Sequence, residues 1–179
     1  MSENKQSFVS QCVLVTVLLI LPTFIFGCGY VSTSSYLEHI KTVNIPLITI
    51  EDPDFSYDAD SGTTYDEIIT EQLRDRFNQK WRDGNDARLD LVILDYDLEP
   101  IQYDVNNNPS QFRMSVQIEY EFRDRVQNRI IDRQENYIQI HDFYITSVTG
   151  EEPETRQEAT TRLIRELTDD LYNQLAEQW

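Results

Sequence analysis

One cysteine, Cys28, stands directly after an apolar segment, and its thiol has the clearest potential chemistry in the chain. The apolar segment covers residues 13–26, and Gly27 precedes the cysteine at the position where a small residue favours cleavage. The segment is short for a membrane span, which needs roughly 20 residues, but it fits a signal-peptide core of roughly 7–15 residues. We therefore predict a signal peptide over residues 1–27 and a mature chain that begins with an acylated Cys28. Several acyl chains on one residue give stable attachment, whereas a single chain binds a membrane only reversibly.

The same segment allows a second interpretation, an uncleaved anchor helix from about Phe8 to Phe26. Both interpretations place the rest of the chain outside the cytoplasm. Gly29 follows the cysteine at the position where Asp tends to retain bacterial lipoproteins in the inner membrane. We therefore expect a lipid-anchored protein of the outer membrane that faces the periplasm.

Other arrangements that could support chemistry are weak. His39 and His141 have no Cys or His companion at the spacing of zinc ligands. Asp58 and Asp60 begin a stretch that resembles a calcium loop, but its twelfth position is Ile69 where a bidentate Glu is needed. The chain has only 5 glycines and contains neither a Gly-rich phosphate loop nor a nucleophile elbow. The sequence predicts no catalytic residues, no metal and no cofactor.

The net charge limits the possible partners. The chain has 15 Lys and Arg residues against 32 Asp and Glu residues, a formal net charge of −17. Such a surface repels nucleic acid, so we expect no nucleic-acid partner. Hydrophobic residues make up 40% of the chain and aromatic residues 11%, which favours a folded domain over disorder. Because Cys12 lies in the signal peptide, no thiol remains to form a disulfide.

The chain divides into few parts. After the signal peptide at 1–27, residues 28–36 form a tether rich in Ser and Thr, and residues 37–179 have the length of one domain. The first predicted strand covers residues 40–48, and Pro46 confines it to an edge or an end of a sheet. A loop rich in Asp follows, over residues 51–62.

The pattern then changes to helical spacing. Thr64 and Glu67 have the spacing of a capping box. Apolar residues recur every fourth position on the face of a predicted helix that Gly84 closes: Tyr65, Ile69, Leu73, Phe77 and Trp81.

Three further strands and a helix complete the order. The second strand covers about Leu89 to Glu99 and ends at Pro100. The third, residues 112–123, alternates strictly between apolar and polar residues, which predicts one buried face and one wet face. A fourth strand lies within residues 130–146, and the last helix follows Pro153 with an apolar stripe. This order predicts an α+β fold, β-α-β-β-β-α, in which two helices pack on a mostly antiparallel four-stranded sheet.

Several short motifs in this order resemble one family. Cys-Gly-Tyr opens the mature chain at residue 28, Ile-Lys-Thr-Val-Asn-Ile-Pro forms the first strand at residues 40–46, and the last helix ends in Leu-Ala-Glu-Gln-Trp at residues 175–179. Together they resemble the LPS-assembly lipoprotein LptE family over essentially all of residues 28–179. The resemblance implies a subunit of the outer-membrane lipopolysaccharide translocon. It also implies that the domain plugs an LptD-type β-barrel, assists assembly of that barrel and contacts lipopolysaccharide during export.

The resemblance also directs attention to basic residues near the tips of the sheet, which in that family are expected to meet lipopolysaccharide phosphates. The corresponding loop here, residues 100–111, contains Asp104 and no Lys or Arg. The remaining candidates for lipopolysaccharide or partner contact are Arg113, Arg123, Arg125 and Arg129. The alternative is that these arginines are solvated and pair with nearby acids, namely Glu119, Glu121, Asp124 and Asp132.

A second class of function stays open at this point. An amphipathic last helix and an alternating strand also suit a periplasmic lipoprotein that binds or activates another envelope protein, for example a peptidoglycan synthase. Co-purification with a large barrel protein would favour the translocon subunit.

Overall fold

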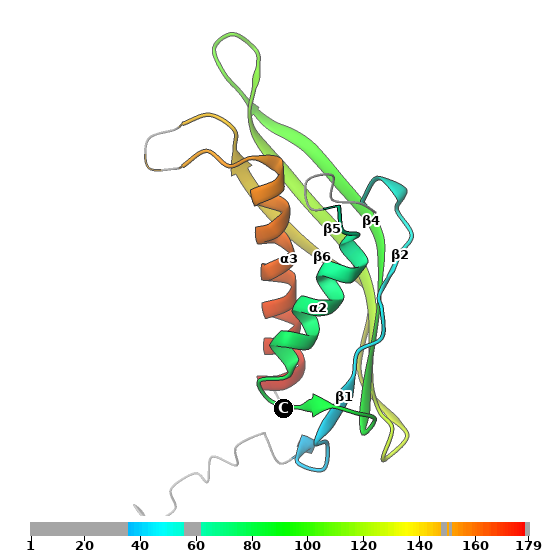
Figure 1. The fold of residues 1–179 in the computed structure, drawn as a ribbon. Coiled ribbons are helices and arrows are strands. Elements are labelled where there is room, and N and C mark those ends of the chain that lie inside the picture. Colours follow the sequence, from blue (N-terminus) through cyan, green and yellow to red (C-terminus); the bar gives the residue numbers. More distant parts are fainter. Residues whose placement is uncertain (1–35, 56–61, 148–149, 151, 178–179) are drawn as a thin grey trace, which may run out of the picture. The chain divides into compact units, whose positions relative to one another are not determined.

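The structure, a computed structural model, describes residues 36–55, 62–147, 150 and 152–177 (Figure 1). The predicted signal peptide, Cys28 and all of the predicted tether except Tyr36 lie outside the described residues, as do Asp58 and Asp60 of the calcium-like stretch. Among the described residues, no helix is long and apolar enough to cross a membrane.

The domain is an α+β fold built on a six-stranded mixed sheet. The strand order is β3-β1-β4-β5-β6, and β2 pairs with β4 beside β1. Three long antiparallel strands form most of the sheet: β4 (Ala87–Tyr103), β5 (Pro109–Asp124) and β6 (Arg129–Tyr144). Three short strands pair in parallel at one side: β1 (Thr42–Asn44), β2 (Thr49–Ile50) and β3 (Arg82–Asp83).

Two helices cover one face of this sheet (Figure 1). They are α2 (Tyr65–Phe77) and α3 (Arg156–Tyr172), and α3 continues into a π-helical turn, η4 (Asn173–Glu177). A short 3-10 turn, η3 (Pro53–Phe55), precedes α2. The predicted apolar stripe of the last helix is confirmed, and each fully buried Leu on it contributes about 1.5–3 kcal/mol. The buried members of that stripe are Ala159, Leu163, Ile164, Leu167, Leu171 and Leu175.

Strand β5 shows the predicted alternation of burial from Met114 to Phe122, whereas Phe112 is only half-buried. Its even-numbered apolar residues from Met114 to Phe122 are buried beneath the helices, whereas the odd-numbered residues from Gln111 to Arg123 are only half-buried. Because side chains alternate between the faces of a strand, this pattern fixes which face of β5 lies against the core.

The prediction of four strands was wrong, since the sheet has six. The predicted first strand at residues 40–48 separates into β1 and β2. The residues between β1 and β2 make hydrogen bonds with side chains of α2. The Arg74 guanidinium donates to the Ile45 carbonyl at 2.6 and 2.9 Å, and the Ile48 N–H donates to Thr70 Oγ1 at 3.1 Å. Pro46 has no N–H to donate to a ladder, which favours this interruption. Strand β3 has only two residues, too few to show an alternation.

The predicted end of the second strand at Pro100 was also wrong. Strand β4 continues to Tyr103, with irregular register on either side of Gln102. Pro100 lies opposite Phe112 of β5, beside a register shift. On the other side of β4, β2 pairs only at Val92 and Ile93, so among the described residues Pro100 lies where β4 has a strand on one side only.

Both ends of α2 differ from the prediction, the first in its capping hydrogen bonds and the second in its position. Thr64 is the N-cap of α2, but its side chain makes no capping hydrogen bond, so the predicted capping box is wrong. Helix α2 ends at Phe77, before Gly84. Gly84 instead lies against Thr42, where an added Cβ would overlap the threonine side chain.

Candidate functional site

The candidate site is the sheet face opposite the helices, which we call the uncovered face. In the part of the chain that the structure describes, this face carries no helix (Figure 1). Its central positions are the odd-numbered residues of β5. Their register partners on β4 are polar or charged apart from Val92, whereas those on β6 include three isoleucines as well as charged residues. The face is therefore a polar surface with its charges close to one another.

Ion pairs and side-chain hydrogen bonds connect neighbouring strands across the uncovered face. The Arg113 guanidinium donates two hydrogen bonds of 2.8 Å to the two oxygens of Asp142. Gln117 Nε2 donates to Asn136 Oδ1 at 2.8 Å, and Arg133 lies 3.2 Å from Glu119 Oε1. Opposite charges on adjacent strands stabilise a sheet face modestly. These contacts pair part of the charge of this face within the protein, whereas Asp95, Asp97 and Glu99 of β4 lie exposed on the same face.

The bidentate pair of Arg113 and Asp142 has the clearest electrostatic effect. The hydrogen bond from Arg113 is the main cause that lowers the pKa of Asp142, and the same contact raises the pKa of Arg113. Both side chains are partly exposed, 41% and 32%. Such a fork also fits phosphate, but here the guanidinium already has a carboxylate partner.

The other three candidate arginines lie at the far end of β5. Arg123 pairs with Glu121 at 2.8 Å, and Arg129 Nε lies 3.3 Å from Asp124 Oδ2. Arg125 is exposed and donates to Asn85 Oδ1 at 3.2 Å.

The structure does not bring the four arginines together in one cluster. Arg113 and Arg123 are ten residues apart on one strand, about 33 Å at roughly 3.3 Å per residue. The predicted pairing with Glu121 and Asp124 is observed for Arg123 and Arg129. Glu119 pairs with Arg133 instead, and Asp132 accepts a hydrogen bond from the Tyr120 hydroxyl at 2.8 Å.

Two isoleucines interrupt the polar character of the uncovered face. Ile138 and Ile140 of β6 are 55% and 48% exposed, and they lie opposite Gln117 and Ser115 in the register. Two neighbouring exposed apolar side chains on a polar surface can form the apolar core of a contact with another protein. The alternation in residues 130–146 could have located them.

The tip of the sheet, between β4 and β5, is acidic. Asp104 Oδ1 accepts the backbone N–H groups of Asn106 and Asn108, each at 2.8 Å. Hydrogen bonds from Asn108 are the main cause that lowers the pKa of Asp104. Asn107 adopts a positive φ of 63°, and Val105 is fully exposed. No Lys or Arg occurs in residues 100–111, so this tip offers no cation to a phosphate.

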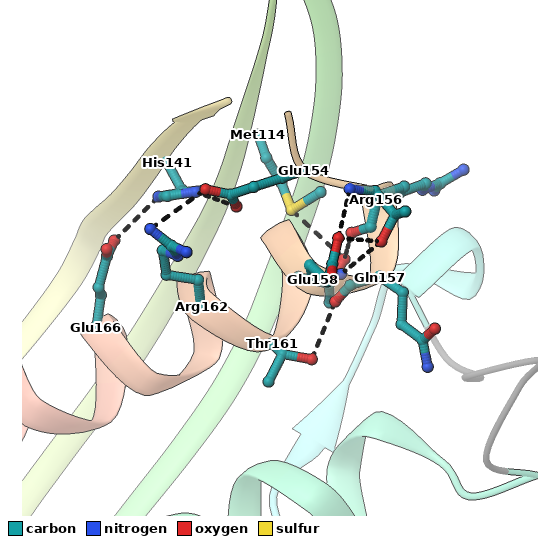
Figure 2. Close-up of polar contacts among 11 residues, drawn as sticks. Met114, His141, Glu154, Arg156, Gln157, Glu158, Thr161, Arg162 and Glu166 are labelled. Atoms are coloured by element: carbon teal, nitrogen blue, oxygen red, sulfur yellow. Dashed lines mark hydrogen bonds and ion pairs between the residues drawn. The ribbon is translucent and has the colours of Figure 1, made fainter. Parts of the chain in front are cut away.

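His141 forms a polar junction between β6 and α3 that its spacing in the sequence does not predict (Figure 2). Its Nε2 lies 3.2 Å from Glu154 Oε2, and its Nδ1 lies 3.5 Å from Glu166 Oε2. Arg162 reaches the other oxygen of Glu154 at 3.2 Å. The two carboxylates hold the imidazole between a loop and a helix, which is a positioning role within the fold.

His39 also pairs with a carboxylate. Its Nε2 lies 2.6 Å from Asp124 Oδ2, and the Asp124 side chain is fully buried. Asp124 also accepts the Gln127 backbone N–H at 2.8 Å. The long separation of His39 and Asp124 in the chain gave no signal of this contact.

The described residues also form an open groove beside α2. An open groove of about 810 Å³ lies between α2 and the segment around β1, and Arg74, Glu71, Asp75 and Leu47 are among its lining residues. No group of three or more His, Cys, Asp or Glu residues that could hold a metal occurs in the described ranges.

Comparison with known proteins identifies the family. The family model whose description is lipopolysaccharide assembly, LptE, matches residues 41–175, which include both helices and all six strands. The chain belongs to the LptE family. Membership supports a role in lipopolysaccharide assembly at the cell envelope. The match includes all four candidate arginines, whereas Cys28 precedes it.

Solved structures include several similar to this LptE-family chain. The rare lipoprotein B of Shewanella oneidensis is 11% identical with a TM-score of 0.44, over 75% of this chain and 93% of that one. A minor lipoprotein of Acinetobacter baumannii is 15% identical with a TM-score of 0.42, over 76% and 93%. A Xanthomonas campestris protein is 7% identical with a TM-score of 0.48, over 75% and 84%. No curated protein matches the chain.

Proposed function

We propose that this chain is the lipoprotein subunit of an outer-membrane lipopolysaccharide translocon, in which it plugs an LptD-type β-barrel and assists assembly of that barrel. The observation that carries the proposal is the LptE family match over residues 41–175. The match runs from β1 into η4 and omits only the last residues of η4. The proposal therefore applies to the whole domain and not to one motif. In this account the protein works by binding and has no catalytic step.

The chemistry of the uncovered face supports a place inside a barrel. The interior of an outer-membrane barrel is polar, in contrast to its lipid-facing exterior. Cross-strand pairs such as Arg113 with Asp142 neutralise part of the charge of the uncovered face. The polar wall of a barrel can supply partners to the charges that remain, and Ile138 and Ile140 can supply apolar contacts there.

The membrane anchor of the proposal is Cys28. With residues 1–27 removed as a signal peptide, acyl chains on Cys28 and its amine would hold the chain on the outer membrane, facing the periplasm. Residues 28–36 then serve as the tether, and residues 37–179 as a single domain.

Lipopolysaccharide is the second proposed partner. Of the four candidate arginines, Arg125 is the best placed for phosphate contact, since it is exposed and its observed partner is the neutral side chain of Asn85. Arg113, Arg123 and Arg129 each pair with a carboxylate, so a phosphate would have to replace that partner.

Affinity purification in mild detergent tests the proposal. The full-length chain is purified from its own membranes, and mass spectrometry identifies the partners and the Cys28 peptide. We expect a barrel protein in equal amount and an acylated Cys28. An acylated Cys28 without a barrel would instead favour a lipoprotein that serves another envelope protein.

A further inference from the structure

The chain's first described residues belong to one end of the domain, which we call the tether end. It consists of residues 36–42, 80–86 and 124–130, which surround the start of β1, strand β3 and the turn between β5 and β6. Backbone contacts join these segments: the Arg82 N–H donates to the Lys41 carbonyl at 3.1 Å, and the Arg125 N–H donates to the Asp86 carbonyl at 2.8 Å. Asp86 Oδ2 in turn accepts the Lys41 N–H at 3.0 Å.

The charge of the tether end differs from that of the whole chain. Its three segments contain five Lys or Arg residues and four Asp or Glu residues, although the chain carries a net charge of −17. Two of the four acids are used inside the fold. Asp124 is fully buried, and Asp86 accepts the backbone N–H groups of Lys41 and Thr42. The charge that remains accessible at this end is mainly positive.

Most of the basic side chains at the tether end lack a carboxylate partner among the described residues. Elsewhere in the fold most arginines are paired, as Arg113 is with Asp142. Lys80 donates to the Ala176 carbonyl, and Arg125 donates to the Asn85 amide oxygen. Lys41, Lys80 and Arg82 line one groove of about 550 Å³, in which Glu38 is the one acid among the lining residues. Cations held in this way are accessible to an anionic surface.

Exposed apolar side chains lie among these cations. Tyr36 is 44% exposed and stacks against Arg129, whose guanidinium carbon lies 4.0 Å from the ring centroid. Val126 and Ile130, beside the β5–β6 turn, are 60% and 45% exposed. Basic residues combined with aromatic and aliphatic ones are typical of protein surfaces that lie at a membrane interface.

From these observations we infer that the tether end docks on the anionic phospholipid headgroups of the membrane that anchors the chain. The inference rests on the proposed acylation of Cys28. Eight residue steps separate Cys28 from Tyr36, so an extended chain reaches at most about 29 Å. The anchor therefore keeps the basic end, and not the acidic tip, within reach of the headgroups. Each Lys or Arg near an anionic membrane strengthens binding by about fivefold.

Headgroup quenching tests this docking. The lipidated protein is placed in nanodiscs of phosphatidylcholine with or without 30% phosphatidylglycerol, a fraction of the lipids carrying a nitroxide on the headgroup. A fluorophore is attached at Gln127→Cys in the turn at the tether end, or at Asn106→Cys in the acidic tip. Both positions are exposed. Strand β5 separates the two labels by about 50 Å at roughly 3.3 Å per residue.

We expect at least twofold stronger quenching at position 127 in anionic discs than in neutral ones, and no such difference at position 106. The triple variant Lys41→Gln, Arg82→Gln, Arg125→Gln, or about 0.5 M salt, should reduce the signal to the neutral level, because salt screens exposed charges. The matched variant Arg156→Gln, Arg162→Gln, Arg165→Gln loses the same charge on α3 and should behave as wild type.

Three results would overturn the docking surface. Equal quenching in both kinds of disc, with a barrel still recovered by purification, would refute docking and leave the translocon proposal intact. A chain that does not enter the discs because Cys28 is not acylated would refute both. Equal loss in the two triple variants would show that net charge, and not this end, controls the approach.

Discussion

At the scale of single residues, individual carboxylates stabilise the ends of the sheet. They accept hydrogen bonds from backbone and side-chain donors. Asp124 is the most buried of these, with donors from His39, Gln127 and Arg129. Burial alone would raise the pKa of Asp124, but the hydrogen bonds from the Gln127 N–H and from His39 outweigh burial and lower it. The ionised form is therefore the one that the fold stabilises.

The variant Asp124→Asn should lower the free energy of unfolding by about 1–3 kcal/mol at neutral pH, because buried donors lose a charged acceptor. An unfolded Asp has a pKa of about 3.9. Since the folded pKa is lower, the contribution of Asp124 is present above about pH 4 and is lost as the pH falls toward the folded pKa. The acid branch of a plot of Tm against pH should therefore be shallower in the variant. Asp97→Asn, at an exposed position, is the control and should change stability by less than about 0.5 kcal/mol.

A second, partly buried network joins η4, the continuation of α3, to the sheet. The Tyr120 hydroxyl donates to Asp132 at 2.8 Å, and Gln174 Nε2 donates to that hydroxyl at 2.7 Å. Burial is the main cause that raises the pKa of Tyr120, followed by the hydrogen bond to Asp132. The hydroxyl therefore stays protonated and able to donate.

The variant Tyr120→Phe should cost about 1–2 kcal/mol in denaturant unfolding, because Asp132 and Gln174 each lose a partner. Tyr103→Phe removes a hydroxyl from a side chain that is 50% exposed and should have little effect. Equal stability of the two variants would contradict the importance of this network.

The scale of elements shows which parts of the fold a sequence can predict. Two elements were predicted correctly because each has a long, regular pattern of apolar residues. They are the strand with alternating residues at 112–123 and helix α3 with its apolar stripe. Short strands are different. Two-residue β3 depends on the position of β1, and the contact of His39 with Asp124 depends on the folded ends of three segments. The spacing of residues in the sequence predicts neither the pairing of β3 nor the contact of His39 with Asp124. For the same reason, the four candidate arginines are near one another in the sequence but are separated along the sheet.

The capping box of the fold lies at the start of α3 and not at the start of α2, where it was predicted. Thr155, not Thr64, forms a capping box: Thr155 Oγ1 accepts the Glu158 N–H, and the Glu158 carboxylate accepts the Thr155 N–H. Hydrogen bonds from Thr155 are the main cause that lowers the pKa of Glu158.

Thr155→Ala should therefore lower the free energy of unfolding by about 1 kcal/mol. Thr161→Ala is a matched control inside the same helix. Thr161 is exposed and its hydroxyl bonds only to the Gln157 carbonyl, so alanine should be neutral or slightly stabilising there. Thermal unfolding of both variants, measured together, separates the effect of the cap from that of helix propensity.

Two surfaces distinguish the whole molecule. The uncovered face has cross-strand ion pairs and exposes Ile138 and Ile140, whereas the tether end combines exposed Lys and Arg residues with exposed apolar side chains. Together they suggest a domain whose sheet and helices meet a partner while its tether end stays near the membrane. A plug inside a barrel is enclosed, so its partner must lie against both the uncovered face and the outer side of the helices.

Site-specific photocrosslinking in the protein's own membranes tests this enclosure most directly. A photoreactive residue is placed at Ile138 or Ile140 on the uncovered face, and at Gln157 or Arg165 on the exposed side of α3. The plug account predicts that all four positions crosslink to the same barrel protein. Crosslinks from one face only, or from neither face to a barrel, would contradict it.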